Sequence, residues 1–193
     1  MPSRLETYRA LLRNEEVRSI SRRYFISNGF DGTLTCIGII VGSFLSGNQT
    51  GLEIVRIVAG GTVGLAASGV WSVWEIERAE KLAELKQVEE KMLTDLHETE
   101  LHDRKGAARK INAAMSGLGP TIGMLLPVTP YFFVGTVLSL LWATVLGVLI
   151  GVAVLFAFGT YMARISGQDW LRAGLRTGAV GIVVGAINIA LPG

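Results

Sequence analysis

The stretch that decides the fold is an apolar run followed at once by an acidic one: LEIVRIVAGGTVGLAASGVWSVW at residues 52–74 and EIERAEKLAELKQVEEKMLTDLHETELHD at residues 75–103. A helix needs about 20 apolar residues to cross the hydrocarbon core of a bilayer, so residues 52–74 are long enough to span it. Residues 75–103, called the acidic segment below, are too polar to stay in lipid. The junction predicts a spanning helix that leaves the membrane near Trp74 and continues into water.

The composition supports a membrane protein. The 193 residues are 50% hydrophobic and only 18% charged, with a mean hydropathy of +0.44, whereas a soluble domain carries about 25% charged residues. The single cysteine, Cys36, excludes an intrachain disulfide and a cysteine-based metal cluster. Basic residues alternate with acids, which argues against nucleic-acid binding, and no Walker-type glycine loop indicates ATP-driven pumping.

Five stretches come near the length of a membrane span. They cover residues 27–46, 52–74, 111–126, 132–162 and 171–191. The third is short, and Pro120, Pro127 and Pro130 predict a kinked segment that ends in a tight turn. The predicted fold class is an all-α membrane protein with five transmembrane helices and a cytoplasmic acidic helical extension between the second and the third.

The chain then divides into four regions. Residues 1–24 are expected to form an N-terminal cytoplasmic or interfacial helix, because Ser3 and Glu6 have capping-box spacing and an apolar stripe opposes arginines. Residues 25–74 hold transmembrane helices 1 and 2. Residues 75–110 form a cytoplasmic acidic, metal-binding helical region, and residues 111–193 hold transmembrane helices 3 to 5.

The positions of lysine and arginine predict the orientation, because cytoplasmic flanks accumulate positive charge. Basic residues gather before the first span, in residues 75–110 and around the turn between the last two spans. All three regions would be cytoplasmic. The N-terminus is therefore expected inside and the C-terminus outside, in a multi-pass protein of the cell membrane.

Asp31 is the residue singled out within the spans. A carboxylate near the start of a spanning helix costs a few kcal/mol unless it faces a partner, a cation or water. Asp31 is therefore a candidate for a transport path. The alternative is an aspartate that only caps the helix or lies among lipid headgroups, since it is near the cytoplasmic end.

The acidic segment supplies hard oxygen ligands for a divalent cation. Its apolar positions have helical spacing, and Glu77, Glu80 and Glu84 would share a face of that helix. Carboxylates three and four residues apart repel each other unless cations compensate them. A divalent metal could do so. A solvated charged helix, stabilised by pairs such as Glu77 with Lys81, is the alternative.

Other residues give weaker signals. His97 with Glu100 and Glu98 with His102 have helical spacing, but exposed histidines without metal are common, so their role stays open. Met92 is either a soft ligand or a packing residue, and Cys36 favours packing. Glycines recur at small-residue spacing in three spans, where they serve packing within one protomer or a dimer contact. These glycines are Gly38, Gly42, Gly147, Gly151, Gly174, Gly178, Gly181 and Gly185.

Three motifs together resemble the vacuolar iron transporter family. They are Phe30-Asp31-Gly32 in the first span, the Gly-x-Leu-Leu-Pro-x-x-Pro turn at residues 123–130, and the glycine-rich close at residues 174–185. The resemblance covers nearly the whole chain. It implies five-helix protomers that form homodimers and move Fe²⁺ or Mn²⁺ out of the cytoplasm in exchange for protons, with no permanent cofactor.

The resemblance also implies roles for individual residues. Asp31 looks like the family's first-span aspartate on the ion path. The expected metal ligands are Glu77, Glu80, Glu84, Glu89, Glu90, Met92, Asp95 and Glu98, of which Glu89 and Glu90 follow from their place in the acidic segment. The family's second-span methionine has no match in residues 52–74, and the acidic segment is short for the family's metal-binding region.

The sequence thus favours a transporter that exports Fe²⁺ or Mn²⁺, with divalent ions, protons, the bilayer and a second copy of the chain as partners. Two alternatives stay open: a membrane scaffold whose charged helix docks a partner protein, and a metal channel or uniporter. No enzymatic activity is expected, because His97 and His102 both lie in the acidic segment and an intramembrane hydrolase would lack its base.

Overall fold

The part of the chain that the structure describes consists of five long helices and one short 3₁₀ helix. The computed structural model describes residues 13–47, 49–92 and 100–190, except the side chains of residues 85, 88–92 and 100–105. Its elements are α2 (Glu15–Ser46), α3 (Gly51–Met92), α4 (Glu100–Val128), η1 (Thr129–Phe133), α5 (Leu140–Ser166) and α6 (Trp170–Ala190). All five α-helices are long and apolar enough to cross a membrane. The predicted all-α fold with five spans is confirmed.

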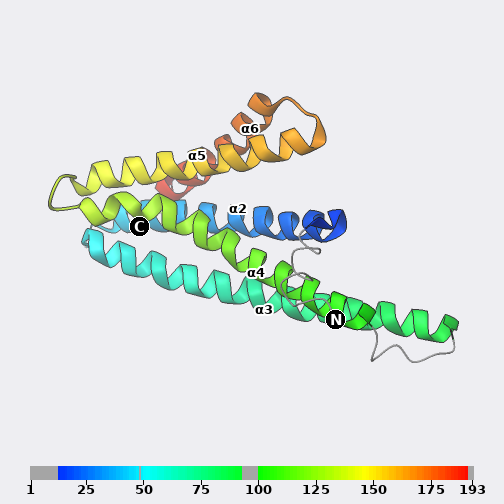
Figure 1. The fold of residues 1–193 in the computed structure, drawn as a ribbon. Coiled ribbons are helices and arrows are strands. Elements are labelled where there is room, and N and C mark those ends of the chain that lie inside the picture. The colour runs from blue at the N-terminus through cyan, green and yellow to red at the C-terminus, as the bar shows by residue number, and fades with distance from the viewer. Residues whose placement is uncertain (1–12, 48, 93–99, 191–193) are drawn as a thin grey trace.

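The helices run alternately up and down and form two groups (Figure 1). In the first, α4 packs against both α2 and α3, and in the second, α5 and α6 form a hairpin that packs on α2. The carboxyl-terminal part of α3 projects past the ends of α2, α5 and α6, with the start of α4 beside it (Figure 1). The end of the molecule with this projection is called the acidic end, and the other is called the opposite end.

The length of α3 explains the projection. A 42-residue helix is about 63 Å long, roughly twice the thickness of a hydrocarbon core. Trp71 is exposed near the middle of α3, and tryptophans favour the membrane interface. On α5, the exposed Trp142 and Tyr161 lie 19 residues apart, which is about 28 Å of helix. By length and composition, the part of α3 that could cross a membrane is Gly51–Glu84.

Glycines bring the backbones of α2 and α4 into contact. A Cβ at Gly119 of α4 would collide with the carbonyl oxygen of Phe25, and one at Gly32 of α2 would lie 2.6 Å from the Cα of Pro120. Gly123 meets the backbone of Gly29 in the same way. Because small residues let membrane helices approach closely, this contact forms the tightest part of the first helix group.

Hydrogen bonds from side chains compensate for Pro120 of α4 and Pro130 of η1. Pro120 has no N–H, so the Ser116 carbonyl lacks its usual helical donor. The Asn28 side-chain amide of α2 donates to that carbonyl at 3.3 Å. Pro130 likewise frees the Leu126 carbonyl, which accepts a bond from the Thr129 hydroxyl at 2.8 Å. The predicted tight turn after the third span is the 3₁₀ helix η1.

The helix bounds differ from the predicted ranges. The helix that holds the third span, α4, begins at Glu100 rather than at residue 111. The bounds differ at two further places. First, α2 begins at Glu15, where Asn14 caps it by accepting from the N–H of Glu16 at 2.9 Å, so residues 15–24 and the first span form one helix. Ser3 and Glu6 of the predicted interfacial helix lie outside the described residues. Second, α5 begins at Leu140 rather than at residue 132, because η1 and a turn with Gly135 at φ 87° precede its cap, Ser139.

Candidate functional site

Asp31 projects from α2 away from the helix contacts of the protomer. Its neighbours Gly29, Gly32 and Thr33 are buried against α4, so the side of α2 that carries Asp31 is left exposed. Asp31 lies 15 residues before Ser46, which is about 22 Å along the helix. If the opposite end of α2 marks one membrane surface, Asp31 lies within the hydrocarbon core of about 30 Å.

Polar and small residues accompany Asp31 on this face. Ser27, Asp31, Thr35 and Gly42 are all exposed and recur at helical spacing; they are called the polar stripe of α2. A Cβ at Gly42 would meet no atom within 4 Å. In contrast, Gly147, Gly151, Gly174 and Gly181 each contact side chains or backbone of a neighbouring helix, so they serve packing within the protomer.

Glu77 is the acid of α3 that faces the other helices. It is 3% exposed, and no other acidic or basic residue with a described side chain is buried. The Tyr24 hydroxyl of α2 donates to Oε1 of Glu77 at 3.3 Å, and Nζ of Lys81 lies 3.7 Å from Oε2. Glu77 therefore links the start of the projecting part of α3 to α2.

Glu80 and Glu84 are exposed on the projecting part of α3. Both lie near the helix face of Glu77, as their spacing predicts, but beyond it along α3. Arg78 pairs with Glu75 at 3.9 Å on the exposed side.

The remaining predicted ligands are only partly placed. Glu89, Glu90 and Met92 belong to α3, although their side chains are not described, and Asp95 and Glu98 lie outside the described residues, as does His97. His102 is within α4, with its side chain undescribed. Among the side chains that are described, no three histidines, cysteines, aspartates or glutamates come together as a metal site.

Sequence reasoning missed a set of polar contacts between α2, α3 and α4. Ser21 of α2 donates to Asn112 of α4 at 2.6 Å, and both are buried. Arg109 of α4 lies over the Trp74 ring at 4.1 Å from its centroid. Together with Tyr24 and Asn28, these residues make a polar layer between the helices near the acidic end. Once α2 is known to begin at Glu15, Ser21, Tyr24 and Asn28 fall at helical spacing on one side of it.

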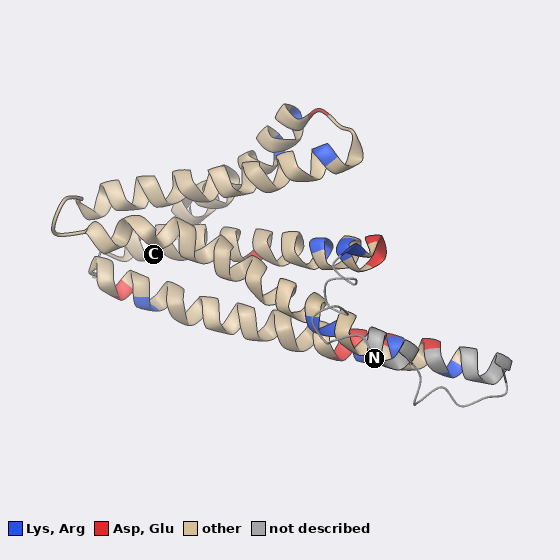
Figure 2. Ribbon diagram, in the orientation of Figure 1, with Lys and Arg blue, Asp and Glu red and all other residues tan. Residues whose placement is uncertain are grey.

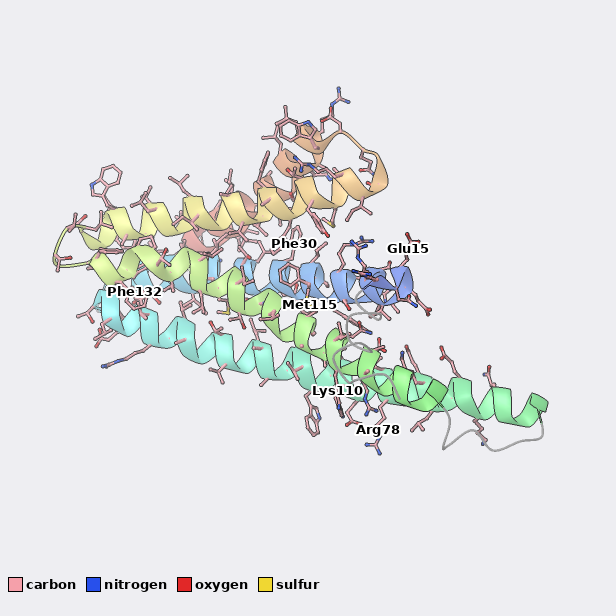
Figure 3. All side chains as sticks on the ribbon, viewed as in Figure 1. Glu15, Phe30, Arg78, Lys110, Met115 and Phe132 are labelled. Atoms are coloured by element: carbon pink, nitrogen blue, oxygen red, sulfur yellow. The ribbon has the colours of Figure 1, made fainter. Side chains whose placement is uncertain are left out.

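Charge is distributed unevenly between the two ends. Figure 2 shows basic and acidic residues together at the acidic end. At the opposite end, Glu53 and Arg56 lie near the start of α3. The basic residues with described side chains at the acidic end are Arg13, Arg18, Arg22, Arg23, Arg78, Lys81, Lys86, Arg109, Lys110, Arg164, Arg172 and Arg176. The one at the opposite end is Arg56. Figure 3 shows Glu15, Arg78 and Lys110 at the acidic end and Phe132 at the opposite end.

A comparison with protein families finds a match over residues 74–191 to the model described as the VIT family, the vacuolar iron transporters. The chain belongs to this family. The VIT match begins at Trp74 and so includes the whole acidic segment. A curated relative, an uncharacterized protein of Methanocaldococcus jannaschii, is 25% identical over 172 residues, which are 88% of this chain and 84% of that protein.

Membership of the VIT family establishes the general class of activity. VIT proteins are membrane transporters of metal ions rather than enzymes. With five apolar helices, this VIT chain is an integral, multi-pass membrane protein. The predicted resemblance to this family is confirmed. The match covers the proline turn at residues 123–130 and the glycine-rich residues 174–185, whereas the Asp31 motif lies before the matched residues.

Proposed function

We propose that this protein exports Fe²⁺ or Mn²⁺ from the cytoplasm across the cell membrane, in exchange for protons, as a homodimer. The observation that carries the proposal is the exposed carboxylate of Asp31 on a helix that spans the membrane. A charge in that position is costly if it faces lipid, so it needs a cation, water or a protein partner beside it. A transported divalent ion supplies the compensating charge.

A second copy of the chain would cover the polar stripe of α2. Ser27, Asp31 and Thr35 avoid lipid if two stripes face each other, and the open space beside Gly42 lets two helices approach closely. Two aspartates would then line one path on the dimer axis. Light scattering of the detergent-solubilised protein tests this arrangement: a mass of one 20.7 kDa chain would contradict it.

The charge distribution supports a cytoplasmic acidic end. Basic residues accumulate on the cytoplasmic side of membrane proteins, and the acidic end carries nearly all of those described. The N-terminus would lie inside, and the C-terminus, after the fifth span, outside. Ions would therefore meet the acidic segment in the cytoplasm before they reach Asp31.

The acidic segment would collect the ion and Asp31 would pass it through the membrane. Glu77, Glu80 and Glu84 offer carboxylates at the start of the segment, and Glu89, Glu90, Met92, Asp95 and Glu98 would complete the binding region. Carboxylate oxygens suit Mn²⁺, and the methionine sulfur favours a softer ion such as Fe²⁺. Protons and metal ions compete for the same carboxylates, so a proton entering from outside would release the metal.

Flux measurements in proteoliposomes test this proposal. We expect uptake of Fe²⁺ and Mn²⁺ into the vesicles to rise when an imposed gradient drives protons out of them. Uptake of Zn²⁺, measured in the same way, tests the selectivity for the metal ion. The triple variant Glu77→Gln, Glu80→Gln, Glu84→Gln should lower the rate at low metal concentration. Unchanged flux in this variant would favour the scaffold function of the acidic helix, and flux that ignores the proton gradient would indicate a channel or uniporter.

A further inference from the structure

The buried carboxylate of Glu77 is held by weak contacts. Burying a carboxylate costs several kcal/mol unless it is paired and hydrogen-bonded. Its hydroxyl donor, Tyr24, lies at 3.3 Å and its cation, Lys81 Nζ, at 3.7 Å. Strong bonds of these kinds are about 2.7–2.9 Å long. Glu77 therefore has the desolvation of a buried group without the short contacts that would fully compensate it.

The nearby guanidinium groups are engaged elsewhere. Arg109 lies over the Trp74 ring, and Arg78 pairs with Glu75 on the exposed side of α3. Arg23 lies over the Tyr24 ring, 5.8 Å from its centroid. Among the described side chains, Lys81 is thus the cation that pairs with the Glu77 carboxylate. The Lys81 side chain is 24% exposed, whereas that of Glu77 is 4% exposed. The ammonium group can consequently move into solvent on its flexible stem while the carboxylate stays in place.

Glu77 lies at the start of the acidic segment, in contact with the helix that carries Asp31. Its hydroxyl partner Tyr24 is seven residues before Asp31, two turns along the same side of α2, or about 10 Å. Glu80, one turn further along α3, is exposed. An ion that moves from the exposed acids toward the membrane passes Glu77 before it reaches the level of Asp31.

We propose that Lys81 is a tethered cation that occupies the place of the metal ion at Glu77 and must leave when the ion arrives. This inference rests on the proposed function and adds a positioning residue to it. A divalent ion brings twice the charge of the ammonium group and can bind Glu77 and Glu80 together. Lys81 thereby weakens ion binding at this step and neutralises Glu77 again after the ion has moved on.

Binding measurements on charge variants test the role of Lys81. Mn²⁺ is titrated into the purified full-length protein in detergent and followed by calorimetry. Lys81→Met removes the competing cation, so Mn²⁺ should bind about three- to tenfold more tightly, as expected for the loss of one partly buried ion pair. Lys81→Arg keeps the charge and should bind as the parent does. Lys86→Met, at an exposed lysine of the same helix, is the matched control and should change little.

A double-mutant cycle assigns the effect to Glu77. In a Glu77→Gln background, Lys81→Met should no longer tighten Mn²⁺ binding, because the carboxylate for which both cations compete is gone. If the methionine variant does not purify, Lys81→Gln replaces it, since it also removes the charge.

The outcomes separate this inference from the proposed function. If the parent binds Mn²⁺ and Lys81→Met binds it equally well or more weakly, the role of Lys81 is overturned and the proposed function stays intact. A purely structural ion pair predicts this result together with a lowered thermal stability of Lys81→Met. A parent protein that binds no Mn²⁺ would overturn both.

Discussion

Asn28 shows how one side chain makes a proline tolerable inside a membrane helix. Pro120 removes the donor for the Ser116 carbonyl, and a bare carbonyl is costly where no water can replace the donor. The Asn28 amide reaches this carbonyl at 3.3 Å and also contacts the Ser116 hydroxyl. The sequence could predict the proline kink, but it could not predict which residue of another helix satisfies the freed carbonyl.

Asn28→Ala should therefore destabilise the protein. The substitution leaves the Ser116 carbonyl and hydroxyl without the amide, and an unsatisfied buried polar group costs about 1–3 kcal/mol. Thermal or denaturant unfolding in detergent measures the change. Ser27→Ala, at the exposed neighbouring position, is the control and should stay close to the parent. Equal stability of the two variants would show that the Asn28 contact has no net effect.

The sequence alone predicted some of the individual residues of the candidate site. Asp31 stands out in the sequence because an acid within a span is rare, and Cys36 is the buried packing residue that its surroundings predict. The burial of Glu77 was not readable. Glu77, Glu80 and Glu84 have the predicted helical spacing, but only Glu77 of the three is buried, where Tyr24 of α2 contacts it. Whether α2 reaches Glu77 depends on where α2 begins, which was not predicted from the sequence.

Among the elements, the contact of α2 with α4 determines where Asp31 points. Gly29 and Gly32 bury one side of α2 against Gly119, Pro120 and Gly123, so Asp31 is left on the uncovered side. Larger residues at the contact would separate the helices.

Gly119→Ala should lower stability markedly. The added methyl group would overlap the Phe25 carbonyl oxygen, which is backbone and cannot rotate away. Overpacking typically costs about 1–3 kcal/mol, and a backbone clash belongs at the upper end. Gly106→Ala, in the same helix, is the control. A Cβ at this position would meet no atom within 4 Å, so alanine should leave the stability unchanged or raise it. Unfolding of both variants in the same detergent compares them, and a Gly119 variant as stable as the parent would refute the tight contact.

Helix existence was predicted better than helix bounds. Hydropathy identifies all five spans, but it continues through Phe132, Phe133 and Val137, so it misses the turn that separates η1 from α5. That turn depends on Gly135 with a positive φ and on the Ser139 cap. Hydropathy also misses the first turns of α2, because residues 15–24 are polar although they belong to the same continuous helix as the first span.

Across the whole molecule, one long helix joins the two parts of the proposed path. The apolar half of α3 lies within the membrane-spanning bundle, and its other half carries the acidic residues outward (Figure 1). Glu77 lies where these halves meet, in contact with the helix that bears Asp31. In the proposed path, an ion collected by the acidic segment would therefore pass Glu77 beside α2.

The most direct test of this account is the rate of Mn²⁺ transport by Asp31→Asn in proteoliposomes. The parent protein and Ser19→Ala, at an exposed serine of α2 outside the polar stripe, are reconstituted at equal density. The amide keeps the size of the side chain but removes the charge that compensates the ion. We expect Asp31→Asn to lose at least about tenfold in rate, since a lost charge contact of over 1.4 kcal/mol corresponds to that factor, while Ser19→Ala retains most of its flux. Transport by Asp31→Asn at the rate of the parent would contradict the account.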